Sequence, residues 1–243
     1  MLKPLHYISL SFLLCLWGCP LILNGENLQS APLRALSVGY EQELRDLVIL
    51  DANMQSSGQL SLRRFRFSKM FKCPIVDGQL VFGISDGINE KGTPQFREVA
   101  SVEWKHSYGN SCLLFLPKSL KGETTPGSSE YSIQIVDMKT NSFKPGHIKI
   151  INTTPWRTMV RAGEHEKGIA AWEVAELSKI EEIGPSRMTQ LIVSYTKEDS
   201  QYHAHQSRIR YLESTRYFVL IYTDMKTKRV TARLVKDSGS LFK

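Results

Sequence analysis

The chain has 243 residues, of which 42% are hydrophobic and 23% are charged, and its formal net charge is +7 at pH 7. This length accommodates one large domain or two small ones, and the composition excludes wholesale disorder. Because acidic residues are interspersed with the basic ones, the modest positive charge favours solubility over a dedicated nucleic-acid-binding surface.

The N-terminal segment has the three parts of an export signal. Lys3 lies in a short basic start, the apolar run ISLSFLLCLWGCPLIL follows, and the polar stretch NGENLQSA comes next. The apolar run is short for a bilayer-spanning helix, which needs about twenty residues. We therefore predict a signal peptide and short linker over residues 1–30, cleaved near Gly25 or Ser30, and an exported protein that is periplasmic or extracellular.

A second interpretation of this segment is a lipoprotein signal. The residues LWGC end at Cys19 and are similar to a bacterial lipobox, in which Cys19 would carry lipid and anchor the protein to a membrane. Trp17 is bulkier than the residues usual at that position, and Pro20 follows the cysteine at once. Cleavage without lipidation is therefore favoured, and lipidation of Cys19 is the alternative.

Beyond residue 33, apolar residues alternate with polar ones far more often than they recur at helical spacing. In SLRRFRF, for example, Phe65 and Phe67 fall on one face of a strand and Arg64 and Arg66 on the other. Turn sequences separate further strand-like segments, which are SVEWKH, SIQIVDM, HIKIIN, TQLIVSY, YFVLIY and RVTARLV. The one convincing helix candidate is YEQELRDLV, whereas AWEVAEL fits a helix and a strand equally well.

About fourteen strands emerge, at the spacing that is typical of β-sandwiches. This number is too large for one common sandwich and suits two sandwiches of seven strands. The sequence therefore predicts an all-β fold of two immunoglobulin-like β-sandwich lobes, residues 34–143 and 144–237, with a polar tail at residues 238–243.

The tetrapeptide DMKT occurs twice, at residues 137–140 and 224–227, each time after an apolar strand that begins with tyrosine. An aspartate side chain accepts hydrogen bonds from the backbone two residues on, which favours turns. Because the flanking sequences diverge, turn chemistry alone explains the match. Duplication of a lobe is an alternative that the two-lobe prediction does not require.

Four cysteines are present, and two of them, Cys15 and Cys19, lie in the export segment. The other two, Cys73 and Cys112, are a candidate disulfide pair, because an exported protein meets an oxidising compartment. A disulfide closing a loop of that span stabilises a fold by about 4 kcal/mol. Two buried free thiols are the alternative.

The motif GISDG (Gly83–Gly87) has the letters of a nucleophile elbow, in which a strand, a sharp turn at Ser85 and a helix follow one another. Gly92 and Pro94 prevent a helix of useful length after it. A hairpin turn is therefore the favoured interpretation, and no catalytic residue is predicted.

Two histidines in YHAHQ, His203 and His205, have the spacing that places both imidazoles on one face of a strand. A metal site needs at least one more ligand, and nothing in the spacing of His147, His165 or Glu213 recruits them. A metal-binding protein or metalloenzyme centred on the two histidines is thus an alternative, set against two exposed histidines on an edge strand.

Trp156 stands beside Pro155 at a predicted turn, where an exposed indole can stack on a sugar ring. A carbohydrate-binding module that uses Trp156 is therefore a further alternative. Trp104 alternates with Val102 and is predicted to lie in the core. The sequon Asn152–Thr154 fits N-glycosylation by pattern, although such letters more often mark a turn or strand end.

The segment LRRFRFSKMFK combines basic and aromatic residues, as nucleic-acid-binding modules do. An ordinary solvated strand face explains it more simply, and RIRYLESTRYF has the same interpretation. For an exported chain, an anionic glycan or envelope surface is a better partner than nucleic acid.

Three stretches in this order, LRALSVGYEQELRDLVIL, FREVASVEWKHSYGNSCLLFLPKS and VDMKTNSFKPGHIKIINTTPWRTMVRAGE, resemble a group of uncharacterised exported β-sandwich proteins of the planctomycete and verrucomicrobial type. The matching positions are a turn aspartate (Asp137), a Phe-x-x-Gly step (Phe143–Gly146), and a strand end (Asn152–Thr154) before a short strand that contains Val160. The resemblance implies an exported β-sandwich fold for most of the mature chain. It implies no site residues, because no catalytic residues are assigned in that group.

These features predict a non-catalytic exported protein that acts as an interaction or structural module at the cell envelope, without a cofactor. Its partner is expected to be a protein or a polysaccharide. Contact with the membrane would occur only through the signal or a lipid anchor.

Overall fold

The computed structural model describes residues 30–39, 43–105, 108, 110–118, 130–139, 141 and 143–237. Residues 1–29 of the predicted signal segment, with Cys19, and the tail at 238–243 lie outside this part of the chain. The described residues form sixteen strands and no α-helix, so none of their elements is a helix suited to crossing a membrane.

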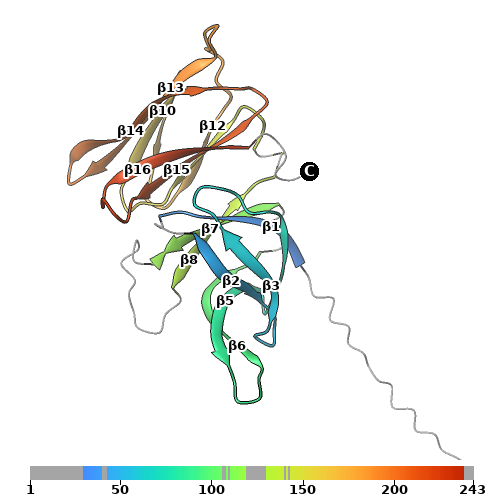
Figure 1. Ribbon diagram of the computed structural model, residues 1–243. Coiled ribbons are helices and arrows are strands. Elements are labelled where there is room, and N and C mark those ends of the chain that lie inside the picture. The colour runs from blue at the N-terminus through green and yellow to red at the C-terminus, as the bar shows by residue number, and fades with distance from the viewer. Residues whose placement is uncertain are drawn as a thin grey trace, which may run out of the picture.

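The first lobe is a sandwich of two four-stranded sheets (Figure 1). Sheet A has the strand order β4-β1-β7-β8, and sheet B has the order β3-β2-β5-β6. Strands β1 and β7 are parallel, and the other neighbours are antiparallel. The strands are β1 (Ser30–Ser37), β2 (Leu44–Leu50), β3 (Ser56–Leu62), β4 (Phe71–Pro74), β5 (Gln79–Ile88), β6 (Pro94–Glu103), β7 (Ser111–Pro117) and β8 (Tyr131–Asp137).

The second lobe repeats this topology strand for strand. Sheet C has the order β12-β9-β15-β16 and sheet D the order β11-β10-β13-β14, with β9 and β15 as the parallel pair. The prediction of an all-β fold with two immunoglobulin-like sandwiches is confirmed, with eight strands in each lobe. The strands are β9 (Ile148–Asn152), β10 (Thr158–Ala162), β11 (His165–Ile169), β12 (Val174–Leu177), β13 (Met188–Lys197), β14 (Ser200–Arg210), β15 (Arg216–Thr223) and β16 (Val230–Asp237).

The two DMKT sequences occupy non-equivalent places in this repeated topology. The first follows β8, and the second joins β15 to β16, whose counterparts are β7 and β8. Both aspartates form the predicted turn: Asp137 Oδ1 accepts from the amide of Lys139 at 2.9 Å, and Asp224 Oδ1 accepts from the amides of Lys226 at 3.1 Å and Thr227 at 2.9 Å. Turn chemistry therefore accounts for the match, independently of the repeated topology.

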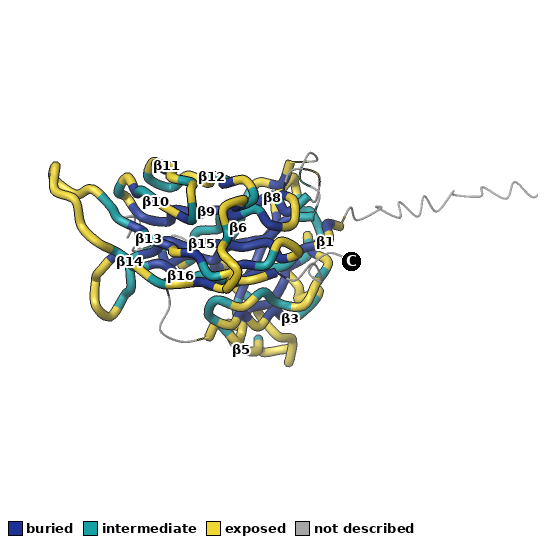
Figure 2. The backbone as a smooth tube through the Cα atoms, turned by 90° about the horizontal axis from the view of Figure 1, so that it is seen from above, coloured by how far each residue is buried: buried dark blue, intermediate teal, exposed yellow. Residues whose placement is uncertain are grey.

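The lobes pack sheet against sheet, and sheets A and C lie in the middle of a four-layer stack. Besides one apolar core inside each sandwich, a third cluster joins side chains of β1, β7 and β8 to those of β9 and β15. Every residue of β7 and β9 is buried, and so are seven of the eight residues of β15. In Figure 2, β9 and β15 run as dark blue segments through the middle of the molecule. Strands that are covered on both faces need no polar side, which explains the continuous apolar runs CLLFLP and YFVLIY.

The predicted helix in YEQELRDLV is wrong, because residues 44–50 form strand β2. Leu47 and Ile49 enter the core of the first lobe, while Val48 and Leu50 pack on the other face of sheet B with Val81. Burial on both faces outweighs the modest helix propensity of the glutamate, arginine and leucine residues in this stretch. In AWEVAEL, the strand alternative is confirmed by β12.

The connection between the lobes is built into the interface. Phe143 is fully buried, and its ring centroid lies 5.0 Å from that of Phe218 on β15. Gly146 has a φ of 82°, and its carbonyl accepts a hydrogen bond of 2.6 Å from the hydroxyl of Tyr211. The ring of Tyr217 stacks on that of Tyr211, and the Tyr217 hydroxyl accepts a hydrogen bond of 2.6 Å from the amide of Leu212. A tyrosine hydroxyl that returns to the backbone just upstream is typical of immunoglobulin-like sandwiches.

Candidate ligand-binding surface

The predicted pair of histidines is separated by a β-bulge. On β14, His205 pairs with Val193 and His203 pairs with Ser194, so Ala204 is the extra residue and packs against the core of the second lobe. His203 is exposed, whereas His205 is partly buried and its Nε2 lies 2.9 Å from Ser207 Oγ. The bulge breaks the alternation on which the prediction of a shared face depended.

The other ligands considered for a metal site have structural partners. His165 Nε2 lies 3.0 Å from the carbonyl of Lys179, and Glu213 forms an ion pair of 2.7 Å with Lys179 Nζ. Throughout the described ranges, no three histidine, cysteine, aspartate or glutamate side chains come together as a metal site. No observation brings a third ligand to His203 and His205.

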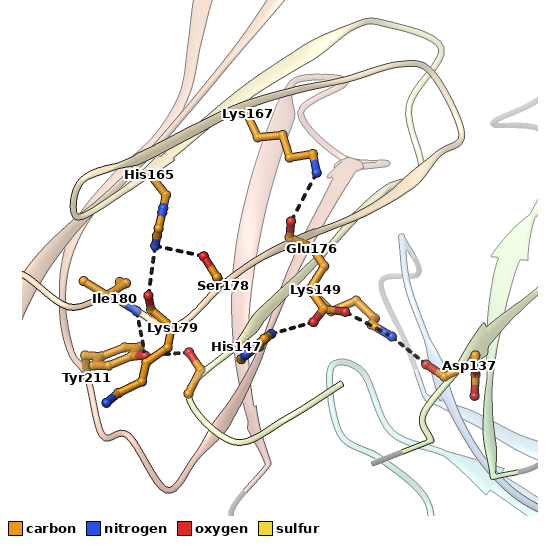
Figure 3. Close-up of polar contacts among 11 residues, drawn as sticks. Asp137, His147, Lys149, His165, Lys167, Glu176, Ser178, Lys179, Ile180 and Tyr211 are labelled. Atoms are coloured by element: carbon orange, nitrogen blue, oxygen red, sulfur yellow. Dashed lines mark hydrogen bonds and ion pairs between the residues drawn. The ribbon is translucent and has the colours of Figure 1, made fainter. Parts of the chain in front are cut away.

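His147 belongs to a polar network at the base of the second lobe (Figure 3). Its Nδ1 lies 2.7 Å from Glu176 Oε1, and the amine of Lys149 lies 3.9 Å from Glu176 Oε2. The same amine donates a hydrogen bond of 2.7 Å to the carbonyl of Asp137, the last residue of β8. Desolvation by burial lowers the pKa of Lys149, opposed by the nearby Glu176 and Asp137 carboxylates. The network thus ties the two lobes together. Sequence reasoning missed it, although a lysine within the apolar strand IKII was a usable signal.

Cys73 and Cys112 are both free and buried, so the predicted disulfide does not form and the alternative of two thiols holds. Cys73 lies in the core of the first lobe, whereas Cys112 lies in the cluster between the lobes, on the opposite face of sheet A. Thiols that point away from each other across a sheet cannot bond without rearrangement of the backbone.

The GISDG motif runs along β5, and no helix follows it among the described residues. Gly83 is required by close packing, since a Cβ atom there would lie 2.7 Å from the carbonyl oxygen of Arg97. The strand continues to Ile88, beyond the position of the predicted turn. The motif therefore lacks the strand-turn-helix geometry of a nucleophile elbow.

Trp156 is the first member of a row of three aromatic rings in the second lobe. Its centroid lies 5.7 Å from the ring of Tyr195 on β13, and Tyr195 stacks on Tyr202 of β14 at 5.3 Å. Trp156 and Tyr195 are partly buried against the core, and Tyr202 is 45% exposed. We call these three side chains the aromatic row.

The predicted sequon fixes the backbone that carries Trp156. Asn152 is fully buried, and its Nδ2 donates to the carbonyls of Trp156 and Ala170, each at 2.8 Å. The Thr154 hydroxyl donates to Asn152 Oδ1 at 2.8 Å. In the folded protein the sequon is thus a buried turn, as the commoner meaning of these letters predicts.

Polar side chains accompany the aromatic row. The Nζ of Lys197 lies 6.0 Å from the centroid of Trp156. A shallow depression of about 230 Å³ adjoins Tyr195 and is lined by hydrogen-bonding groups that include Arg157, Asp199 and Gln201. Ring faces with donors and acceptors beside them can hold an amphipathic ligand such as a sugar.

No family model and no curated protein matches this sequence. Among solved structures, the chain is similar to a protein of Bacteroides uniformis that has been proposed to act in cell adhesion, with 12% identity over 86% of this chain and 97% of that one. The TM-score of 0.25 indicates that the two structures do not superpose closely, so this likeness carries no conclusion about function.

Proposed function

We propose that this protein is a non-catalytic, exported interaction module that works at the cell envelope, in the periplasm or outside the cell. The signal-like N-terminal sequence supports the export, and the aromatic row carries the proposal of interaction. Three adjacent rings are held in place by two strands and by a turn whose hydrogen bonds Asn152 satisfies. Rings that are already fixed lose little conformational entropy when a ligand binds.

A polysaccharide is the partner class that fits the aromatic row best. The rings offer flat apolar faces for the C–H side of a sugar, and the depression beside Tyr195 offers hydrogen-bonding groups for its hydroxyls. A neutral glycan suffices for this interaction, because stacking does not depend on charge.

The test is binding of neutral polysaccharides, measured by affinity electrophoresis and by tryptophan fluorescence. Tyr202→Ala removes the exposed ring and is expected to weaken binding by roughly tenfold, equivalent to about 1.4 kcal/mol, because stacking on that ring is lost. The control is Val174→Ala, which removes another exposed apolar side chain, 42% exposed, from strand β12. Equal effects of the two variants, or no binding by the unaltered protein, would contradict the proposal.

Retention at the envelope by a lipid on Cys19 stays an alternative within this proposal. Mass spectrometry of the mature N-terminus distinguishes a diacylated Cys19 from a free N-terminus near Gly25 or Ser30.

A further inference from the structure

A cleft of about 600 Å³ lies in the first lobe, beside the connection between β3 and β4. Its wall combines residues 59–61 of β3 and Phe71 of β4 with Arg63 and residues 66–70, which belong to the basic and aromatic stretch RRFRFSKM. Strand β3 ends at Leu62, so most of this stretch is not the regular strand that its alternation predicts. Phe65 and Phe67 still pack against the cluster between the lobes, but the basic residues that line the cleft, Arg63, Arg66 and Lys69, do not follow the predicted alternation, and Arg64 does not line it.

The connection is anchored at several points, so the wall of the cleft is preformed. Phe65 and Phe67 pack into the cluster between the lobes, where their centroids lie 5.0 Å from Tyr222 and 5.1 Å from Phe218. Arg64 pairs with Asp224 of the second lobe at 3.2 Å.

Ser68 joins the same connection to strand β1 by hydrogen bonds. Its amide donates to the carbonyl of Ala35 at 2.7 Å, and its Oγ accepts from the amide of Ala35 at 3.0 Å. Its carbonyl accepts from Arg34 Nη1 at 2.7 Å. The basic side chains on either side of Ser68 are therefore carried by a fixed backbone.

The cleft is positively charged. Arg63, Arg66 and Lys69 line it, and no acidic side chain of the described residues does. Arg66 and Lys69 have no ion-pair partner within the part of the chain that the structure describes, and Arg63 lies 3.9 Å from Glu43, whose carboxylate is 3.1 Å from Arg45. Apolar side chains, including Phe67 and Met70, complete the lining.

We propose that this cleft binds an acidic sugar unit of an anionic polysaccharide. Guanidinium groups pair with carboxylates and sulfates through two parallel hydrogen bonds, and the apolar lining suits the C–H face of a sugar ring. The volume lies within the range of small-molecule sites, about 300–1,000 Å³. The site is in the other lobe from the aromatic row and takes a charged ligand, so it goes beyond the proposed function.

The experiment is isothermal titration calorimetry of the protein with trigalacturonate, with a sulfated heparin-derived tetrasaccharide and with uncharged maltotriose. We expect at least one acidic oligosaccharide to bind and to be weakened by salt, and maltotriose not to bind at the cleft. The double variant R66A/K69A should bind the acidic ligand about tenfold or more weakly, because it removes two of the three cations.

The matched control is R208A/R210A, which removes two exposed arginines of β14 in the second lobe. It carries the same change of charge and should alter the affinity by less than about twofold, which is within the effect expected from long-range charge. Tyr202→Ala should also leave the binding of the acidic oligosaccharide intact. The experiment can therefore contradict ligand binding at the cleft without contradicting glycan binding at the aromatic row, and the reverse. Unchanged far-UV circular dichroism shows that each variant is folded.

Three outcomes would overturn the inference. The first is that neither acidic oligosaccharide binds, and the second is that the control R208A/R210A loses as much affinity as R66A/K69A. The third is that R66A/K69A abolishes co-sedimentation with phosphatidylglycerol vesicles while no oligosaccharide binds, which would assign the basic residues to a membrane surface.

Discussion

At the scale of single residues, buried polar side chains connect strands and lobes of this protein through hydrogen bonds and ion pairs. Arg216 and Asp237 are 3% and 0% exposed, and the Arg216 Nε donates to Asp237 Oδ2 at 2.7 Å. A further donor of Arg216, Nη1, donates to the carbonyl of Met138, just after strand β8 of the first lobe, at 3.2 Å. Buried charges persist only when they are paired and hydrogen-bonded, so these contacts hold β15, β16 and the end of the first lobe in register.

The two free thiols give a direct test at this scale. Burial raises the pKa of Cys73 to about 12 and also raises that of Cys112. Because the thiolate is the reactive form, neither should react with Ellman's reagent at pH 8 in the folded protein. In a chain that lacks residues 1–29, urea should expose two thiols per molecule, whereas a disulfide between them would leave none to titrate.

His205 should make the protein sensitive to mild acid. Burial, followed by the charges of His203 and Arg233, lowers its pKa below the usual 6.5. The unfolded chain therefore takes up the proton first, and the stability falls as the pH drops below about 6.5. Urea midpoints between pH 7.5 and pH 5 should decrease more for the unaltered protein than for His205→Gln.

His203→Gln supplies the graded control for this titration. It removes the contribution of His203, which is smaller than that of burial, and leaves the contribution of Arg233, so its loss of stability in acid should lie between those of the unaltered protein and His205→Gln. Parallel urea midpoints for the unaltered protein and His205→Gln over this pH range would count against the prediction.

At the scale of elements, the connection between β8 and β9 shows how a short stretch fixes two lobes. Gly146 combines a positive φ of 82° with close neighbours, since a Cβ atom there would lie 3.0 Å from the Tyr211 hydroxyl and 3.2 Å from the Glu213 carbonyl. Both the backbone conformation and the space therefore require glycine.

Three glycine-to-alanine variants separate these two requirements. Gly184→Ala has open space and no positive φ and should be neutral or slightly stabilising, and Gly78→Ala, with a φ of 77° but open space, should cost about 1 kcal/mol. Gly146→Ala adds crowding to the same backbone strain and should cost at least about 2 kcal/mol. Free energies of unfolding from urea titrations check this order. Equal values for Gly78→Ala and Gly146→Ala would show that the residues around Gly146 move to make room for the added methyl group.

Most strands could be predicted from the sequence, because a side chain that alternates between core and solvent leaves a period of two. Strand β2 could not, since its second half, Leu47–Leu50, is buried on both faces and its residues also suit a helix. The sequence also could not predict which face of β14 carries His203 and which carries His205. The extra residue of a β-bulge reverses the alternation of side chains between them, and a bulge has no sequence signal of its own.

At the scale of the whole molecule, the stack of four sheets makes the two lobes depend on each other. The cluster between them buries twelve side chains, among them Leu114 of sheet A and Leu220 of sheet C. Separating the lobes would expose this apolar surface to water, which is unfavourable in proportion to its area. We therefore expect the lobes to unfold together.

Leu220→Ala tests this coupling. Leu220 is fully buried in the cluster, so the truncation should lower the free energy of unfolding by about 2–5 kcal/mol. Tryptophan fluorescence follows each lobe in a chain without residues 1–29. The variant W156F/W172F keeps only Trp104, which reports on the first lobe, and the variant W104F keeps Trp156 and Trp172, which report on the second lobe. Both reporters should give the same shifted transition, whereas Val174→Ala should shift neither. Separate transitions for the two reporters would contradict the coupling.

The sequence by itself determined that the chain is built of strands in two sandwich lobes, that Trp104 is buried, and that Asp137 and Asp224 accept turn hydrogen bonds, because these features depend on local periodicity and local hydrogen bonds. Only the tertiary structure decided that the lobes repeat one topology and share an apolar interface, that Cys73 and Cys112 face apart, and that Trp156 joins two tyrosines from another hairpin. Those features arise from contacts between segments far apart in the chain, and the letters of a single sequence do not specify which distant faces meet.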